Sequence, residues 1–435
     1  MRAFAKIAVV LLLSIVTQSQ TKPSNKRRPG AISASAHKLV ELKVTGTNLY
    51  SPNQVIATTG LKVGQNVNEE ALKEATQKLG ETRLFTNVTY SYSFTGEGTK
   101  VELQLADNEK LVPVEFDNLV WFSNQQLLDK IHQAIPLFQG KVPAGGGLVD
   151  EIADILSVPL AQKNPQLHLD YLRSGADSTN PVVFSVSGTQ ISIQKIEYPG
   201  ASSTRLPALN AASQKIEGRT YQHSVLADFA KTTLEPIYLK DGYLKAAFSE
   251  PEAHVVSESS DETVVDVKLP IAEGQQYKLS SLSFSGNAVF SSDKLQPQIH
   301  LQPGVPVSAL RLKDDLEGVR RLYGTRGYIK AAVEPHMEFD DAAATVSYRI
   351  EVKEGDVYKM GDLQLEGLED KSVARMREDW TLREGETYDS TYSQRFVKRA
   401  VADLPADAHW SIAVNESVNE QDKTVDVTLR FAKAQ

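Results

Sequence analysis

The sequence predicts an α+β chain of five tandem modules, each about 80 residues long with the element order β-α-α-β-β. The first observation is a glycine before the main helix of every module, recurring at intervals of 76 to 86 residues: Gly64, Gly140, Gly218, Gly304 and Gly385. The second is a helical apolar period after each glycine, and the third is a closing strand with alternating apolar residues. Such repetition is typical of small similar domains in series.

Module four has the clearest pattern. Its main helix carries one apolar face ending near Gly324, with Leu312, Leu316, Val319 and Tyr323 at helical spacing. Asp340 and Asp341 are expected in the hairpin turn. The last strand alternates through four apolar residues: Val346, Tyr348, Ile350 and Val352.

The other modules repeat this order with more or less contrast. In module one, Ser51 and Asn68 are expected to cap the two helices. Module three is expected to hold a helix over 224–239. Module two is the least regular, because Pro159 and Pro165 interrupt its second half, and module five is recognised mainly by its closing strand at Val425–Leu429. For each module we expect a three-stranded mixed sheet with two helices on one face.

Short polar junctions set the expected boundaries. The predicted segments are a signal peptide (1–19), a flexible basic lead-in (20–37) and five modules: 38–107, 108–188 (degenerate), 189–274, 275–355 and 356–435 (degenerate).

The first 19 residues are typical of an export leader. Arg2 and Lys6 precede a short apolar run, Ile7 to Val16, that is too short to span a bilayer. An uncleaved anchor is the alternative. The chain has no cysteine, which excludes disulfides, thiolate metal sites and a lipid-bearing cysteine.

The charge argues against nucleic acid as a partner. Removing residues 1–19 takes away two basic residues and no acid, which changes the net charge from −8 to −10. The one basic cluster, Lys22 to Arg28, is either a solvated tail or a segment that touches anionic surfaces.

No residue pattern predicts an enzyme, a cofactor, a metal site or a small-molecule substrate. The eight histidines include no His-x-x-x-His pair, and Gly145–Gly147 lacks the lysine of a phosphate-binding loop. The acid pairs Asp314-Asp315 and Asp340-Asp341 are explained by a solvated helix face and a turn. Trp121-Phe122 is the one aromatic pair with two open interpretations, core packing or exposure.

Two segments resemble a known family. Tyr238–Ala246 and Leu322–Ala331 look like the tyrosine, glycine-tyrosine, alanine signature of polypeptide-transport-associated (POTRA) domains in outer-membrane protein assembly factors of the BamA and TamA type. Phe284–Asn287 is similar to the family's opening motif, and Leu84–Val88 to a variant of the signature. The glycines of the signature, Gly242 and Gly327, permit a positive φ after the helix, and Tyr243 and Tyr328 are expected to cap the core.

The resemblance implies a non-enzymatic periplasmic array that binds unfolded outer-membrane polypeptides. It also implies that the second strand is the edge to which a client strand adds. The candidate residues are Val88, Thr89, Tyr90, Ser91 and Tyr92 in module one and Ile329, Lys330, Ala331, Ala332 and Val333 in module four.

A structural adaptor is the alternative function, in which the array links a separately encoded barrel or assembly lipoproteins. The printed sequence ends at Gln435, directly after the fifth module, so we expect no membrane β-barrel in this chain. An exported enzyme ranks third.

Overall fold

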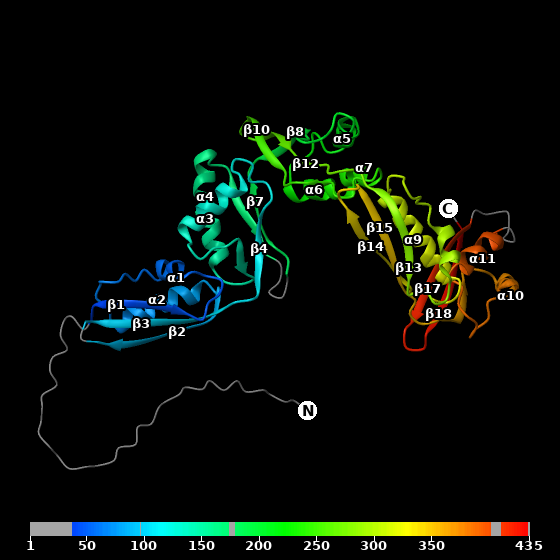
Figure 1. Ribbon diagram of the computed structural model, residues 1–435, viewed down its shortest axis with the longest axis horizontal. Coiled ribbons are helices and arrows are strands. Elements are labelled where there is room, and N and C mark those ends of the chain that lie inside the picture. Colours follow the sequence, from blue (N-terminus) through cyan, green and yellow to red (C-terminus); the bar gives the residue numbers. More distant parts are fainter. Residues whose placement is uncertain (1–36, 96, 174–178, 402–409, 434–435) are drawn as a thin grey trace, which may run out of the picture. The chain divides into compact units, whose positions relative to one another are not determined.

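The computed structural model describes residues 37–95, 97–173, 179–401 and 410–433 (Figure 1). The predicted leader and the lead-in up to residue 36 lie outside them. The described residues form two compact units: one holds those up to Pro113, Ile131–Glu151 and Thr179, and the other those of Val114–Lys130, Ile152–Ser174 and Asn180–Gln435. Among these residues, every helix falls short of the length and apolarity that crossing a membrane requires.

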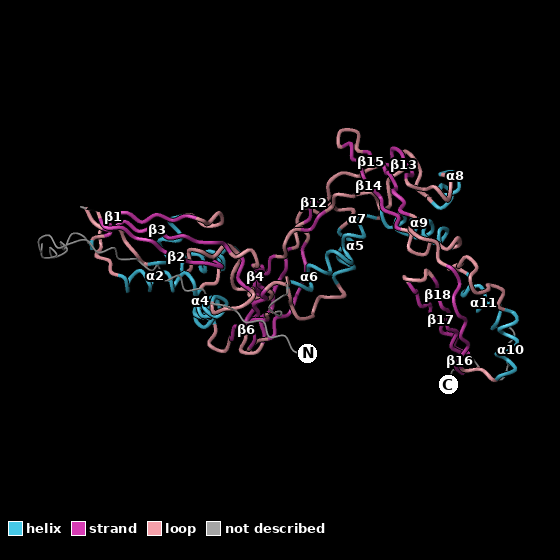
Figure 2. The backbone as a smooth tube through the Cα atoms, turned by 90° about the horizontal axis from the view of Figure 1, so that it is seen from below, coloured by secondary structure: helices cyan, strands magenta, loops and turns pink. Residues whose placement is uncertain are grey.

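Modules one, four and five share one sheet topology. The first strand lies parallel to the third, which is central, and the second strand is antiparallel to the third on its other side. The prediction of an α+β chain with mixed sheets is therefore confirmed. In Figure 2, α10 and α11 lie on one side of the strands of module five.

The elements of these three modules follow the predicted order. Module one has β1 (Leu39–Thr45), α1 (Pro52–Thr59), α2 (Glu69–Glu81), β2 (Phe85–Phe94) and β3 (Thr99–Asp107). Module four has β13 (Lys278–Ser285), α8 (Ser292–Leu295), the 3₁₀ turn η3 (Gln296–Gln298), α9 (Ala309–Gly324), β14 (Ala332–Asp340) and β15 (Thr345–Lys353). Module five has β16 (Lys359–Glu366), α10 (Asp370–Asp379), α11 (Tyr392–Ala400), β17 (Trp410–Asn419) and β18 (Thr424–Lys433).

The caps predicted for module one are present. Ser51 forms a capping box with Gln54, and the Asn68 side chain accepts a hydrogen bond from the Ala71 N–H at 2.9 Å. In module four, Asp340 ends β14 and its carboxylate accepts from the Ala342 and Ala343 N–H groups, as the predicted turn requires.

Module three adds a small ribbon to the same three-stranded sheet. Its order is β10-β11-β8, and β9 pairs with β12 separately. The predicted helix over 224–239 is one helical stretch with a π-helical segment in its middle. The elements are β8 (Gln190–Glu197), α5 (Leu206–Ser213), α6 (His223–Phe229), η2 (Ala230–Leu234), α7 (Glu235–Leu239), β9 (Ala247–Phe248), β10 (Glu252–Glu258), β11 (Glu262–Lys268) and β12 (Ile271–Ala272).

Module two corrects two expectations. Its sheet has four strands in the order β5-β4-β7-β6 rather than three. Pro159 does not interrupt α4, because Ile152, Leu156 and Leu160 form a fully buried stripe whose burial outweighs the roughly 3 kcal/mol cost of an internal proline. The elements are β4 (Leu111–Phe116), α3 (Asn124–Ala134), β5 (Lys141–Pro143), α4 (Leu148–Lys163), β6 (His168–Leu172) and β7 (Val182–Ser187).

The repeated glycine before each main helix has a backbone role. All five of these glycines have positive φ. In module four, the Gly304 N–H donates to the Leu279 carbonyl at 2.8 Å, and the Leu279 N–H donates to Val305 at 3.0 Å. The same pair of bonds recurs from Gly64, Gly218 and Gly385 in modules one, three and five. The glycine therefore ties the loop before the main helix to the first strand.

In modules three and four, a glutamate at the end of the module accepts hydrogen bonds from the main helix and from the loop after the first strand. Glu273, at the end of module three, accepts from the Tyr238 hydroxyl at 2.9 Å and from the Ser202 N–H at 2.8 Å. Glu354 takes the same place in module four, where it accepts from Tyr323 at 3.0 Å and from the Val289 N–H at 2.7 Å. In these two modules, one glutamate therefore connects the end of the module to its main helix and to the loop after its first strand.

Because of the Glu273 contacts, we expect the stability of module three to fall at acid pH. Burial by itself raises the pKa of Glu273, but hydrogen bonds from Ser202 and Tyr238, together with the charge of Arg205, hold that pKa below its usual range. A depressed folded-state pKa means that the stabilisation is present above the unfolded value of about 4.3 and is lost as pH falls through the folded-state pKa. In Glu273→Gln, amide-exchange protection over 189–274 should therefore vary less with pH below about 4.3 than in the unaltered chain. An unchanged pH profile would contradict this, and Asp261→Asn, in an exposed turn, is the control.

Candidate functional site

The predicted edge in module one is an aromatic strand. Val88 to Tyr92 all lie in β2, which pairs only with β3 among the described strands. Tyr92 and Phe94 are 45% and 55% exposed, and their rings meet edge to face at 5.5 Å. A long, exposed, apolar edge strand is a surface on which another extended chain can pair.

The predicted edge in module four starts three residues later than expected. Ala332 and Val333 lie in β14, but Ile329, Lys330 and Ala331 do not, because the Ala331 N–H closes a turn onto the Tyr328 carbonyl at 3.2 Å. The Ile329 side chain packs against the core of module five instead.

The strand β14 is an edge of a different kind from β2. Pro335 lies within it and has no N–H to donate, a feature typical of edge strands that resist further pairing. Its exposed face is charged rather than aromatic. Strand addition is therefore less favoured at β14 than at β2.

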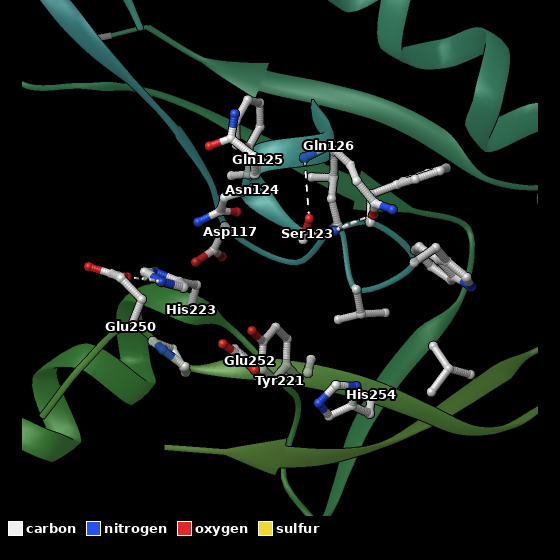
Figure 3. A pocket seen from close by; sticks show the side chains of 18 of the residues that line it. Asp117, Ser123, Asn124, Gln125, Gln126, Tyr221, His223, Glu250, Glu252 and His254 are labelled. Carbon is white, nitrogen blue, oxygen red and sulfur yellow. Dashed lines mark hydrogen bonds and ion pairs between the residues drawn. The ribbon is translucent and has the colours of Figure 1, made fainter. Parts of the chain in front are cut away.

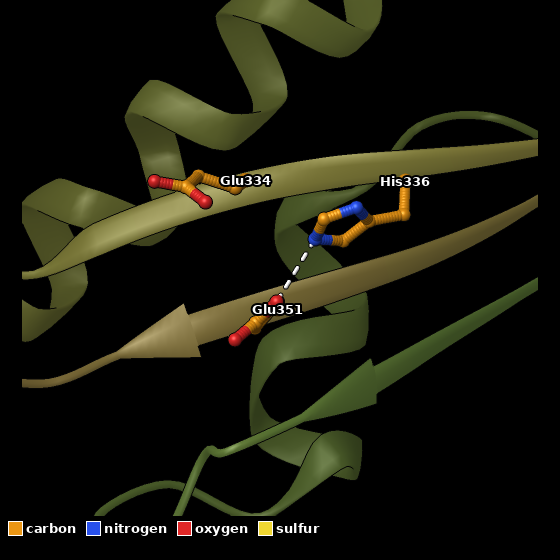
Figure 4. A group of neighbouring side chains, drawn as sticks. All are labelled: Glu334, His336 and Glu351. Atoms are coloured by element: carbon orange, nitrogen blue, oxygen red, sulfur yellow. Dashed lines mark hydrogen bonds and ion pairs between the residues drawn. The ribbon is translucent and has the colours of Figure 1, made fainter.

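Three polar side chains form a group, two on β14 and one on the neighbouring strand β15. Figure 4 shows Glu334 and His336 on one strand and Glu351 on the other. One nitrogen or oxygen atom of each side chain lies within 4.8 Å of those of the other two. His336 lies 2.9 Å from Glu351, and Lys353 lies 3.2 Å from Glu334. All are partly or fully exposed, so ordinary contacts between polar side chains on neighbouring strands account for the group.

One predicted acid pair is corrected. Asp314 is exposed as expected, but Asp315 is only 5% exposed and accepts hydrogen bonds from the His300 N–H at 2.7 Å and from its Nδ1 at 2.6 Å. The reason is helical spacing: Asp315 lies three residues after Leu312, on the buried face of α9.

The glycine-tyrosine signature lies at the joints between modules. Tyr243 and Tyr328 are half-buried against the core of their own module, as the packing interpretation predicts. The glycine carbonyls, however, bind the next module: Gly242 accepts from the Tyr277 N–H and Gly327 from the Tyr358 N–H, both at 2.8 Å.

The residues after the signature extend these joints. Leu244 packs against the core of module four, and Lys245 lies 2.6 Å from Asp341 in that module's hairpin turn. Lys330 pairs with Glu420 in the hairpin turn of module five in the same way. The segment that identifies the fold also joins consecutive modules.

A hollow of about 760 Å³ lies between the loop before α3 and the start of β10. Figure 3 shows Asp117 and the polar first residues of α3 on one side, and His223, Glu250 and Glu252 on the other. Among the residues that line it are four carboxylates, one lysine and two histidines: Asp117, Glu250, Glu252, Glu258, Lys163, His223 and His254.

The loop that forms one wall is fixed on module three. The Asp117 carboxylate accepts from the Ser224 N–H at 3.0 Å and from its hydroxyl at 2.8 Å, and the His223 N–H donates to the Asp117 carbonyl at 2.8 Å. Val120 is part of the core of module three and Trp121 packs against it, so the core-packing interpretation of Trp121 is right, although the core belongs to the next module.

Sequence reasoning missed most of this hollow. Its acids come from two modules and share no spacing, so no periodic signal connects Asp117 with Glu250. The sequence analysis singled out Trp121 and Phe122 only as a pair that either packs in the core or is exposed.

Comparisons with known proteins match one module to a known family and place other proteins beside the chain. A POTRA family model, described as a surface antigen variable number repeat, matches residues 277–355. A putative outer membrane protein assembly factor of Treponema pallidum is 22% identical over 207 residues, which is 46% of this chain and 25% of that protein. Outer membrane protein assembly factor BamA of Nitratidesulfovibrio vulgaris is 20% identical over 279 residues, 61% of this chain and 34% of that protein.

This chain therefore spans a quarter to a third of the length of these two relatives. Among solved structures, the POTRA3-5 segment of Haemophilus influenzae BamA has 20% sequence identity and a TM-score of 0.42, covering 56% of this chain and 97% of that one.

Proposed function

We propose that this chain, a tandem-POTRA protein related to the outer-membrane protein assembly factors, holds unfolded outer-membrane polypeptides in the periplasm without catalysing a reaction. In this proposal all five modules are POTRA-like domains with the boundaries 38–107, 108–188, 189–274, 275–355 and 356–435. Residues 1–19 direct export, and residues 20–37 are a flexible lead-in. Assembly lipoproteins or a separate outer-membrane barrel are further partners of the array.

The observation that carries the proposal is the exposed aromatic edge of β2. An extended client gains backbone hydrogen bonds there whatever its sequence, and the rings of Tyr92 and Phe94 offer apolar contact to alternate client side chains. Pairing of this kind suits many clients, because main-chain groups are common to all of them. Of the two candidate edges, we assign the main role to β2, since Pro335 interrupts the donor pattern of β14.

Hydrogen exchange on the full chain tests this assignment. Adding a urea-unfolded outer-membrane β-barrel protein should slow exchange over residues 85–94. Replacing Tyr92 and Phe94 together by threonine should weaken binding about tenfold, because two partly exposed rings each contribute on the order of 0.5–1 kcal/mol. Met337→Thr, which removes an exposed side chain from β14, is the matched control and should bind normally. Slowed exchange confined to other strands would contradict the role of β2.

The adaptor function has its own supporting observation, the repeated joints at Gly242–Lys245 and Gly327–Lys330. Joints of this kind favour a spacer of defined geometry. A single stoichiometric partner recovered from detergent-solubilised envelopes, with no binding of unfolded clients, would favour the adaptor over the client-binding function.

A further inference from the structure

The strand β10 combines a sheet edge with an adjoining hollow. In the order β10-β11-β8 it has no partner on its outer side among the described strands. Four of its consecutive residues, Glu252 to Val255, line the hollow, and so does Glu258. An extended chain paired with β10 would therefore pass beside the hollow, and its alternate side chains could enter it.

The lining of this hollow is mainly acidic. It holds four carboxylates against one lysine and two histidines. The Glu250 side chain is 75% exposed, and its carboxylate lies 2.5 Å from the Nε2 atom of His223. Carboxylates on an edge strand discourage pairing with neutral or acidic chains, whereas a basic chain neutralises them.

Aromatic rings stand beside these carboxylates. Trp121 and Phe122 line the hollow and are partly exposed, and the Nζ atom of Lys130 lies 6.0 Å from the centre of the Phe122 ring. Tyr221 also lines it, but is only 4% exposed. A planar guanidinium can stack on an aromatic ring and donate two hydrogen bonds to a carboxylate at the same time, which an ammonium group cannot do. The combination of rings and acids therefore selects arginine over lysine.

The hollow is formed before any ligand enters. Asp117 fixes the loop through Ser224 and His223, and the Trp121 indole N–H donates to Glu258. Little ordering remains to be done on binding, which favours affinity.

We propose that this hollow is a specificity subsite for an arginine side chain of an extended polypeptide that pairs with β10. The inference rests on the proposed function, because it requires that the chain binds extended clients. It adds a preference: among such clients, segments with an arginine in the strand that meets β10 bind more tightly.

Binding of labelled short peptides to the full chain tests the subsite. The probes are alternating threonine-valine peptides with arginine, glutamine or glutamate at the centre, followed by fluorescence anisotropy at low salt. The arginine peptide should bind about fivefold more tightly than the glutamine peptide, as expected for partly exposed ion pairs. It should also slow amide exchange over 252–258. N-methylation of alternate peptide nitrogens should abolish binding, because it removes the donors that pair with the strand.

A double variant assigns the preference to the acids. Glu250→Gln with Glu252→Gln should bring the arginine and glutamine peptides to the same affinity. Asp314→Asn with Glu378→Gln removes two exposed acids elsewhere and should leave the difference unchanged. Lysine in place of arginine should bind more weakly than arginine.

The outcomes separate the two proposals. Equal affinity of the arginine and glutamine peptides for the unaltered chain, or protection away from 252–258, overturns the subsite and leaves client binding intact. Failure of every peptide and of the unfolded barrel protein to bind overturns both.

Discussion

Gly286→Ala is expected to destabilise module four by about 4 kcal/mol. Gly286 has a φ of 75°, a backbone conformation that costs an L-residue about 1–2 kcal/mol. A Cβ there would also overlap the carbonyl oxygen of Val352 on the central strand, and forced overpacking adds about 1–3 kcal/mol.

Gly304→Ala is the matched control. Its φ is 78°, close to that of Gly286, but a Cβ there would meet nothing within 4 Å. It should cost only the conformational strain of about 1–2 kcal/mol. Amide exchange over residues 277–355 in the full chain measures both variants. Equal losses of protection would show that crowding against Val352 adds nothing.

The crowded position recurs at the end of the first strand in other modules. A Cβ would overlap a carbonyl of the central strand at Gly46 in module one and at Gly367 in module five, and the Ile271 carbonyl of β12 at Gly200 in module three. The close approach is therefore part of the repeat, and alanine at any of these positions should be as costly as at Gly286.

Tyr323→Ala is expected to destabilise module four by a similar amount, about 4 kcal/mol. The Tyr323 side chain is fully buried, and truncating a buried aromatic side chain costs about 3–5 kcal/mol. Tyr323→Phe should cost about 1–2 kcal/mol, because it removes only the hydrogen bond to Glu354. Tyr328→Ala should cost less than Tyr323→Ala, since Tyr328 is half-buried.

Urea titration of the full chain, with exchange followed over 277–355, ranks the three variants. A larger loss from Tyr328→Ala than from Tyr323→Ala would contradict the ranking. The ranking matters because the glycine-tyrosine step is the feature that the sequence makes most visible, whereas Tyr323, five residues earlier at the end of α9, carries more of the core.

The sequence predicted the repeat well where local rules decide it. Helix caps at Ser51 and Asn68, the apolar face of α9 and the turn at Asp340 depend on residues a few positions apart, and all were predicted correctly. The errors are at Ile329–Ala331, at Pro159, at Asp315 and in the four-stranded sheet of module two. At Ile329 and Pro159, packing overrides the local preference, whereas the burial of Asp315 follows from the helical spacing of α9.

The candidate sites follow the same division. The aromatic character of β2 can be read from alternating Tyr90, Tyr92 and Phe94 in the sequence. Pro335 is also visible in the sequence. That it lies inside β14 was not, because the strand begins at Ala332, three residues later than predicted. Nothing local predicted that Asp117 and Glu250 line one hollow.

By itself, the sequence determined the α+β class and the element order of modules one, four and five, because these depend on periodicity and on conformational preferences within short stretches. Only the tertiary structure decided that Gly242 and Gly327 bind the following module and that a loop of module two packs into the core of module three. Contacts of this kind join residues from different modules, and their partners carry no shared spacing for a sequence pattern to reveal.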